Sequence, residues 1–304
     1  MQNSFLDELK NKWQYGGMHI KLIFINAAVF LLIKILLVLG HLFSTPGSKN
    51  VFESIINNIF TLKGNLQGIL THPWGLFTSI FAHFGFFHLL FNMVFFYFIA
   101  KFFLMYFSNQ RLLYTYILGG IAGGLLQTLA YSVFPRYIES EVLVVGASGA
   151  VNAVFMAAAF YRPMEEVNLF GLFRVKMMYL ALAFILLDLL RMGGDDNVAH
   201  FAHLGGAIFG YLSIRNIDSP SNIINWSQRK VSNIKAQFRG KRKLKVKKGG
   251  NKRTAVNQNN DDLYRKNQKN RQEQIDAILD KIAKSGYDSL TKEEKKILFD
   301  QSQR

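Results

Sequence analysis

Residues 146–150 read Gly-Ala-Ser-Gly-Ala, which puts Ser148 at the head of an apolar run that continues to Phe160. A serine in an apolar helix most often bonds the carbonyl one turn earlier. Two other apolar runs also contain polar residues, in the patterns His83-x4-His88-x3-Asn92 and His200-x2-His203. Polar side chains at membrane depth are unfavourable and mark functional sites, so their presence in three separate runs indicates a shared role.

The composition indicates the class of protein. Half of the residues are apolar, and they come in long blocks rather than at amphipathic spacing, as in membrane-spanning segments. The chain has no cysteine, which excludes a disulfide framework, a thiolate nucleophile and a cysteine-based zinc site. We therefore expect a polytopic membrane protein.

The apolar blocks predict an all-α bundle of six transmembrane helices. They lie at about 19–43, 86–107, 112–134, 146–161, 177–190 and 198–214. The fourth and sixth are short and rich in Gly and Ala, so we expect them to pack closely in the centre of the bundle. Between the first two spans, residues 44–82 carry apolar side chains at helical spacing, which predicts short helices in the membrane interface.

The chain divides into four segments. Residues 1–18 are typical of an interfacial amphipathic segment and not of a cleavable signal, and residues 19–214 hold the six spans. Residues 215–270 are expected to form a basic, largely disordered linker, and residues 271–304 a helical hairpin. Thr291-x-x-Glu294 predicts a capping box in this hairpin, whose partner the sequence does not identify.

The positive charge is concentrated in the tail. The formal net charge is +16, and residues 215–304 hold 23 Lys and Arg against 10 Asp and Glu. Residues 229–253 hold 12 of these bases and no acid, which is typical of a segment that binds anionic lipid headgroups. Phe238 is the only aromatic residue there, so the pattern disfavours nucleic-acid binding. With six spans, the basic flanks fall on one side, which predicts both termini in the cytoplasm.

Ser148 needs a neighbouring base to become a nucleophile, and histidine suits neutral pH. His200 and His203 are the candidates, and His203 is better placed because glycines follow it one and two turns later on one face. We expect Asp188 to pair with Arg191 at the surface, and Asp195 and Asp196 lie at the preceding turn. With no carboxylate placed to complete a triad, a Ser-His dyad is the simplest interpretation.

His88 and Asn92 lie one helical turn apart on the same face. Together with the backbone N–H of Ser148, they could donate hydrogen bonds to an oxyanion. Taken alone, the pair is better explained as two interhelical hydrogen bonds.

The sequence disfavours three other kinds of function. A metal site built on His83, His88, His200 and His203 lacks the H-E-x-x-H pattern of zinc proteases, so we expect no metal and no cofactor. The serine motif is not the G-x-S-x-G elbow of soluble hydrolases. A small transporter is the main rival from another class, although no charged pathway is evident.

Three motifs in this order resemble the rhomboid intramembrane serine proteases. They are HFGFFHLLFN at 83–92, GASGA at 146–150 and AHLGGAIFG at 202–210. The resemblance implies Ser148 as nucleophile, His203 as general base, His88 and Asn92 as oxyanion donors, and a structural role for His83. It implies cleavage of single-span membrane proteins, and the C-terminal hairpin resembles an accessory of rhomboids from Bacteroidetes-type bacteria. The expected location is therefore a bacterial inner membrane.

The sequence departs from the family pattern at three places. The usual Trp-Arg pair of the first loop reads Trp74-Gly75, and Leu104 stands near the place of an acidic residue. Asn152 occupies a position where many relatives carry an aromatic residue, and we expect it to hydrogen-bond His203. A catalytically inactive rhomboid-like protein that binds membrane clients is the alternative function.

Overall fold

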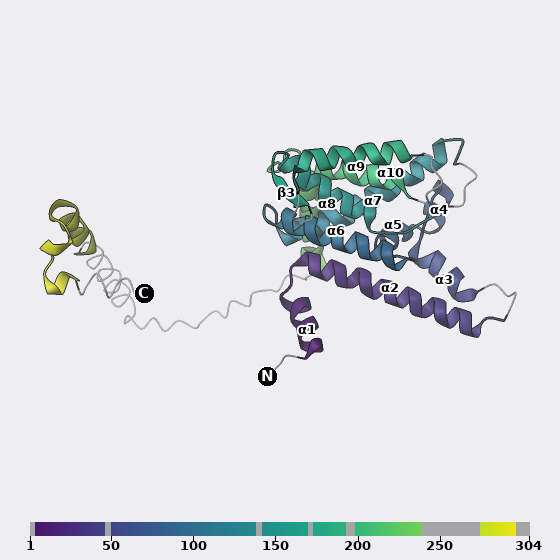
Figure 1. The fold of residues 1–304 in the computed structure, drawn as a ribbon, viewed down its shortest axis with the longest axis horizontal. Helices are drawn as coiled ribbons and strands as arrows, with labels where there is room; N and C mark the ends of the chain where they lie inside the picture. The colour runs from purple at the N-terminus through teal and green to yellow at the C-terminus, as the bar shows by residue number, and fades with distance from the viewer. Residues whose placement is uncertain are drawn as a thin grey trace, which may run out of the picture. The chain divides into compact units, whose positions relative to one another are not determined.

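The computed structural model describes residues 4–45, 50–137, 142–169, 173–192, 198–238 and 274–295. Within these residues the chain is mainly helical (Figure 1). Six helices coincide with the six predicted spans within a few residues. They are α2 (Met18–Phe43), α6 (Phe86–Leu104), α7 (Asn109–Val133), α8 (Ser148–Tyr161), α9 (Met177–Arg191) and α10 (His200–Ile214).

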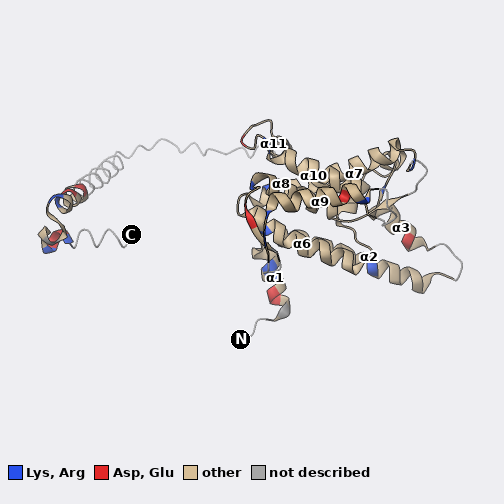
Figure 2. Cartoon of the chain, turned by 45° about the horizontal axis from the view of Figure 1, so that its top comes forward, with Lys and Arg blue, Asp and Glu red and all other residues tan. Residues whose placement is uncertain are grey.

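These helices carry few charged side chains (Figure 2). Three of them, α2, α6 and α7, are long and apolar enough to cross a membrane. The other three have 14, 15 and 15 residues, which is short for a membrane span. A crossing by all six helices therefore stays a prediction.

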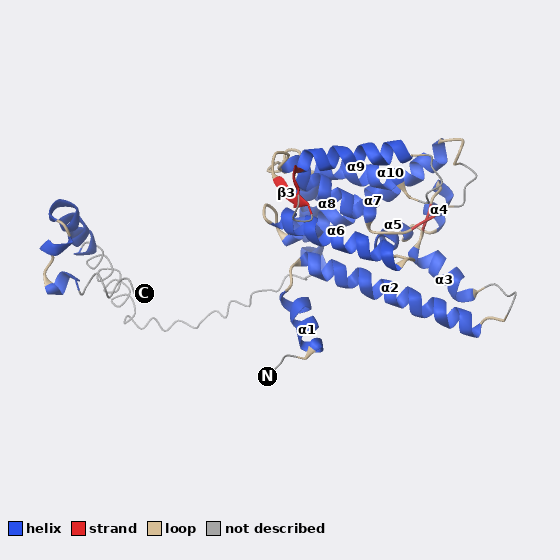
Figure 3. Cartoon of the chain, in the orientation of Figure 1, coloured by secondary structure: helices blue, strands red, loops and turns tan. Residues whose placement is uncertain are grey.

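Short elements fill the segment between α2 and α6, as its apolar periodicity predicts. They are α3 (Val51–Phe60), β1 (Leu62–Lys63), α4 (Leu66–Thr71), α5 (Gly75–Thr78) and the 3-10 turn η1 (Ser79–Phe81). Strand β1 pairs antiparallel with β2 (Leu143–Val144), just before α8. A second antiparallel pair, β3 (Glu166–Leu169) with β4 (Phe173–Lys176), links α8 to α9 (Figure 3). At the N-terminus, α1 (Phe5–Tyr15) forms where an amphipathic helix is expected.

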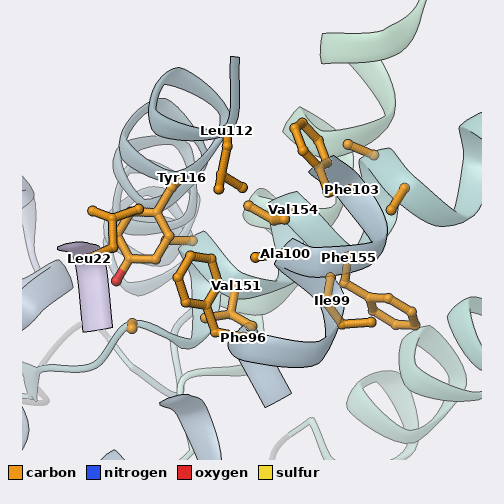
Figure 4. Packing of buried hydrophobic residues seen from close by; sticks show 14 of the residues in the cluster. Leu22, Phe96, Ile99, Ala100, Phe103, Leu112, Tyr116, Val151, Val154 and Phe155 are labelled. Atoms are coloured by element: carbon orange, nitrogen blue, oxygen red, sulfur yellow. The ribbon is translucent and has the colours of Figure 1, made fainter. Parts of the chain in front are cut away.

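Helix α8 lies in the centre of the bundle, as its small residues predict. Every residue from Gly149 to Ala159 is buried. Val151, Val154 and Phe155 of this helix pack into one apolar cluster with Phe96 and Phe103 of α6 (Figure 4). Leu22, Leu112 and Tyr116 extend the cluster to α2 and α7.

Glycines bring the backbones of the central helices into contact. A Cβ added at Gly206 of α10 would overlap the carbonyl oxygen of Gly149 in α8. A Cβ at Gly123 of α7 would lie 2.5 Å from the carbonyl oxygen of Ala202. Any larger side chain at these positions would push the helices apart.

A buried arginine joins the start of α7 to the chain that follows α10. Arg111 donates to the Ser213 carbonyl at 2.6 Å and to the side chains of Asn222 and Asn225 at 3.1 Å each. This contact holds helix α11 (Ile223–Phe238), which forms in a segment expected to be linker. Residues 239–270 of that segment, which include most of the basic run, lie outside the described residues.

The described part of the C-terminal segment contains a helix over 274–285, the turn η2 (Tyr287–Ser289) and a helical turn over 292–295. The capping box forms, because the Thr291 amide donates to Glu294 Oε2 at 2.7 Å and the Glu294 amide donates to Thr291 Oγ1 at 3.3 Å. Lys281 pairs with the same carboxylate at 2.9 Å. The Thr291 amide, followed by the Lys281 ammonium, lowers the pKa of Glu294.

The contact at Gly206 predicts a stability effect. We expect Gly206→Ala to destabilise the folded protein by about 1–3 kcal/mol, because the added methyl group overlaps the α8 backbone. Gly85→Ala is the matched control, since a Cβ there meets its nearest neighbour at an ordinary 3.7 Å. Denaturant titration of both variants in detergent measures the difference, and equal midpoints would contradict the close contact.

The lowered pKa of Glu294 predicts how the capping box responds to acid. The ionised carboxylate stabilises the box above its ordinary pKa of about 4.3, and this stabilisation is lost as the pH falls through the lowered pKa. We expect the Thr291 amide proton, followed by NMR, to titrate with a midpoint below about 4.3. Glu294→Gln should abolish this titration, whereas a higher midpoint in the unchanged protein would show that the carboxylate is not held ionised.

Candidate active site

Ser148 is the first residue of α8, and two contacts hold the chain before it. Strand β2 pairs with β1, and the Gly146 amide donates to the Ser79 carbonyl at 3.0 Å. Gly146 has a φ of +128°, which side-chain-bearing residues rarely adopt. The serine therefore enters the helix from a fixed turn, where the first backbone N–H groups have no acceptor within the helix.

His83 supports this turn from below the site. It is fully buried, and its Nε2 accepts a hydrogen bond from the Ala147 amide at 3.4 Å. Its ring also packs edge-on against His88, with centroids 4.9 Å apart. These contacts agree with a structural role for His83.

His88 faces the same space as the serine hydroxyl. A Cβ added at Gly146 would lie 2.8 Å from His88 Cε1 and 3.9 Å from Ser148 Oγ. Asn92, one turn along α6, donates from Nδ2 to the His88 carbonyl at 2.9 Å. An amide group has two N–H hydrogens, so this bond leaves the second one to donate elsewhere.

Helix α10 brings His203 to the same place. Its first turn packs on the start of α8, where a Cβ at Gly149 would lie 3.0 Å from the Ala202 carbonyl oxygen. The Ala202 amide donates to Gln127 of α7 at 3.1 Å, which fixes this turn. The structure thus gathers Ser148, His203, His88 and Asn92 from three helices.

Asp188 is the residue that sequence reasoning misplaced. The sequence predicts that Asp188 pairs with Arg191, and this prediction is wrong. Asp188 lies against α10, where its Oδ1 is 2.8 Å from His200 Nδ1 and 2.9 Å from His203 Nδ1. A carboxylate therefore does contact the candidate base. Asp195 and Asp196 lie outside the described residues.

This contact also bears on two other expectations. The Nδ1 of His203 faces Asp188, so it is not the atom that would bond Asn152, which is buried in α8. Among the residues that the structure describes, Asp188, His200 and His203 form a group of possible metal ligands, with ligand atoms within 4.8 Å of one another. That group contains neither His83 nor His88.

The site is open to its surroundings. Among its members, His88 is exposed, and Ser148, Asn92 and His203 are half-buried. Asp188 and His203 keep 13% and 17% of their side-chain surface exposed. The site residues are therefore not sealed inside the bundle.

Comparison with known proteins places this site in a family. Residues 70–216 match the rhomboid domain, and residues 258–304 match a family of unknown function, DUF6576. RHOMBOID-like protein 12, mitochondrial, of Arabidopsis thaliana is 30% identical over 166 residues, which are 51% of this chain and 49% of that protein. RHOMBOID-like protein 1 of the same plant is 33% identical over 140 residues, which are 46% of this chain and 33% of that protein.

The chain thus spans about half the length of the first relative and a third of the second. The matched domain contains every residue of the candidate site and five of the six apolar helices of the bundle. The all-α architecture and the apolar helices agree with a multi-pass membrane protein. The chain therefore contains a rhomboid domain at residues 70–216.

Proposed function

We propose that the protein is an intramembrane serine endopeptidase that cleaves single-span membrane proteins. The observation that carries this proposal is that the first turn of α10, with His203, packs on the start of α8, where Ser148 lies beside His88. Ser148 is the nucleophile and His203 the general base.

The chemistry follows from these positions. The Nε2 of His203 accepts the proton of Ser148 Oγ as the oxygen attacks the carbonyl carbon of the scissile peptide bond. The imidazolium then gives this proton to the leaving nitrogen, the C–N bond breaks, and an acyl ester remains on Ser148. A water molecule, deprotonated by the same imidazole, hydrolyses the ester and frees the serine.

The carbonyl oxygen becomes negatively charged during the attack. The backbone amide of Ser148 lies at a helix N-terminus, where negative charge is favoured. The exposed His88 ring and the second amide hydrogen of Asn92 are the further donors on this side of the serine. No cofactor is needed for these steps.

A membrane-embedded substrate helix shields its carbonyl groups in its own hydrogen bonds. The segment to be cut must therefore unwind before Ser148 can attack it. We infer that substrates carry small or helix-destabilising residues near the cleaved bond, because such segments unwind at low cost.

The basic residues support an orientation. Lys10, Lys12 and Arg111 flank one end of the spans, as do Arg174 and Lys176 before α9. We propose that this end and both termini face the cytoplasm of a bacterial cell, with the basic run after α11 on anionic headgroups.

The proposed nucleophile and base can be tested by substitution. We expect a fluorophosphonate probe to label the detergent-solubilised protein, and Ser148→Ala and His203→Ala to lose both this labelling and cleavage of a single-span reporter. Ser227→Ala, at a half-buried position of α11, and His41→Ala, at an exposed position of α2, are matched controls, and they should keep both activities.

A folded wild-type protein that neither reacts with the probe nor cuts the reporter would contradict the proposal. It would favour the alternative function, a rhomboid-like protein that binds membrane clients without cutting them. Reporter capture by the Ser148→Ala variant as well as by the wild type would then be the expected finding.

The proposed oxyanion donors can be tested in the same way. We expect His88→Ala and Asn92→Ala each to lower kcat by about 100- to 1000-fold with little change in KM, because the donors act only on the charged intermediate. Asn58→Ala, at an exposed position of α3, should leave kcat unchanged. A rise in KM at constant kcat would show instead that these side chains bind the substrate.

A further inference from the structure

Asp188 is the only acidic residue in α2 and in α6 to α10. An ionisable group at this depth is unfavourable unless it has partners, and such groups mark functional sites. Its partners are His200 and His203, and the second of these is the proposed base.

The geometry fixes the direction of the hydrogen bonds. Both imidazoles approach the same oxygen, Oδ1, through Nδ1, at 2.8 and 2.9 Å. An ionised carboxylate only accepts, so both Nδ1 atoms must carry a proton. When His203 is neutral, its Nε2 is then the unprotonated nitrogen, which is the state that a general base requires.

We propose that Asp188 is a positioning residue that holds His203 as the Nδ1–H tautomer, with Nε2 free to take the proton of Ser148. The carboxylate also stabilises the imidazolium that forms when that proton arrives. This inference rests on the proposed function, because it assigns Asp188 a role through the base and not through contact with the substrate.

The distances favour this role over a metal site. Two ligands of a tetrahedral zinc ion, each about 2.0–2.2 Å from the metal, are about 3.3–3.6 Å apart. The nitrogen-to-oxygen distances to His200 and His203 are shorter and match hydrogen bonds. His200 thus shares the carboxylate as a second donor and helps to keep it ionised.

The test compares the whole protein with Asp188→Asn and Asp188→Glu, reconstituted in lipid with a single-span reporter. We expect Asp188→Asn to lower kcat at least about tenfold, and by as much as the roughly 10⁴-fold seen when a triad aspartate is replaced, with KM within twofold. Asp188→Glu restores the charge and should recover part of the loss. Arg191→Gln, one turn later on the same helix, is the control and should keep the wild-type kcat.

A spectroscopic readout separates positioning from a general loss of structure. With ¹⁵N-labelled histidine, and His203→Gln to assign the signals, neutral His203 should carry its proton on Nδ1 in the wild type and shift toward Nε2 in Asp188→Asn. A kcat within twofold of wild type in Asp188→Asn, or a wild-type His203 protonated on Nε2, would overturn the proposal. Activity removed by EDTA and restored by zinc would also overturn it, in favour of a metal site.

Failure of the proposed function gives a different result. The wild type would then neither cleave the reporter nor react with the probe, while the Nδ1 proton of His203 would still depend on Asp188. That outcome would support the Asp188 contact and reject the protease.

Discussion

The structure depends on the backbone contact between α8 and α10. Neither helix could approach the other this closely with side chains at Gly149 and Gly206, because a Cβ at the latter would overlap the carbonyl oxygen of the former. In a membrane, apolar side chains gain little by leaving lipid, so close packing of small residues is what holds helices together. The same contact carries His203 to the start of α8, so stability and the proposed chemistry share one feature.

A second constraint acts on the turn before the serine. Gly146 takes a backbone conformation that favours glycine, and His83 holds the amide of Ala147. The α8 N-terminus is therefore aimed at His88 by two residues that do not take part in the chemistry. This explains why the motif has glycine on its N-terminal side and why a buried histidine stands far upstream in the sequence.

Much of the fold could be predicted from the sequence. The apolar blocks give the helices within a few residues, and the Gly and Ala content of α8 indicates its central place. The capping box at Thr291 follows from a local pattern, and local hydrogen bonds form it. The roles of Ser148 and His203 stay predictions, although the structure brings their helices together at the expected turn.

Other features depend on long-range packing that spacing along the chain does not encode. Spacing along the chain favours a pair between Asp188 and Arg191, which are three residues apart. In the structure, the side of α9 that carries Asp188 faces α10 instead. Helix α11 was missed because its anchor, the buried Arg111, lies 111 residues before Asn222. The signal that could have revealed Asp188 was its isolation, as the one acid in these apolar helices beside two histidines.

The position of Asp188 on α9 has a consequence for substrate entry. The buried residues of this helix, Met177 and Ala181, lie in its first half, and Phe184 stacks on Phe95 of α6. Its second half exposes Leu186 and Leu190, and the hydrogen bonds of Asp188 join this half to α10. If a substrate helix displaces this part of α9, the base loses the group that orients it. For the proposed protease, a substrate must therefore either leave the Asp188 contact intact or allow it to re-form before Ser148 attacks.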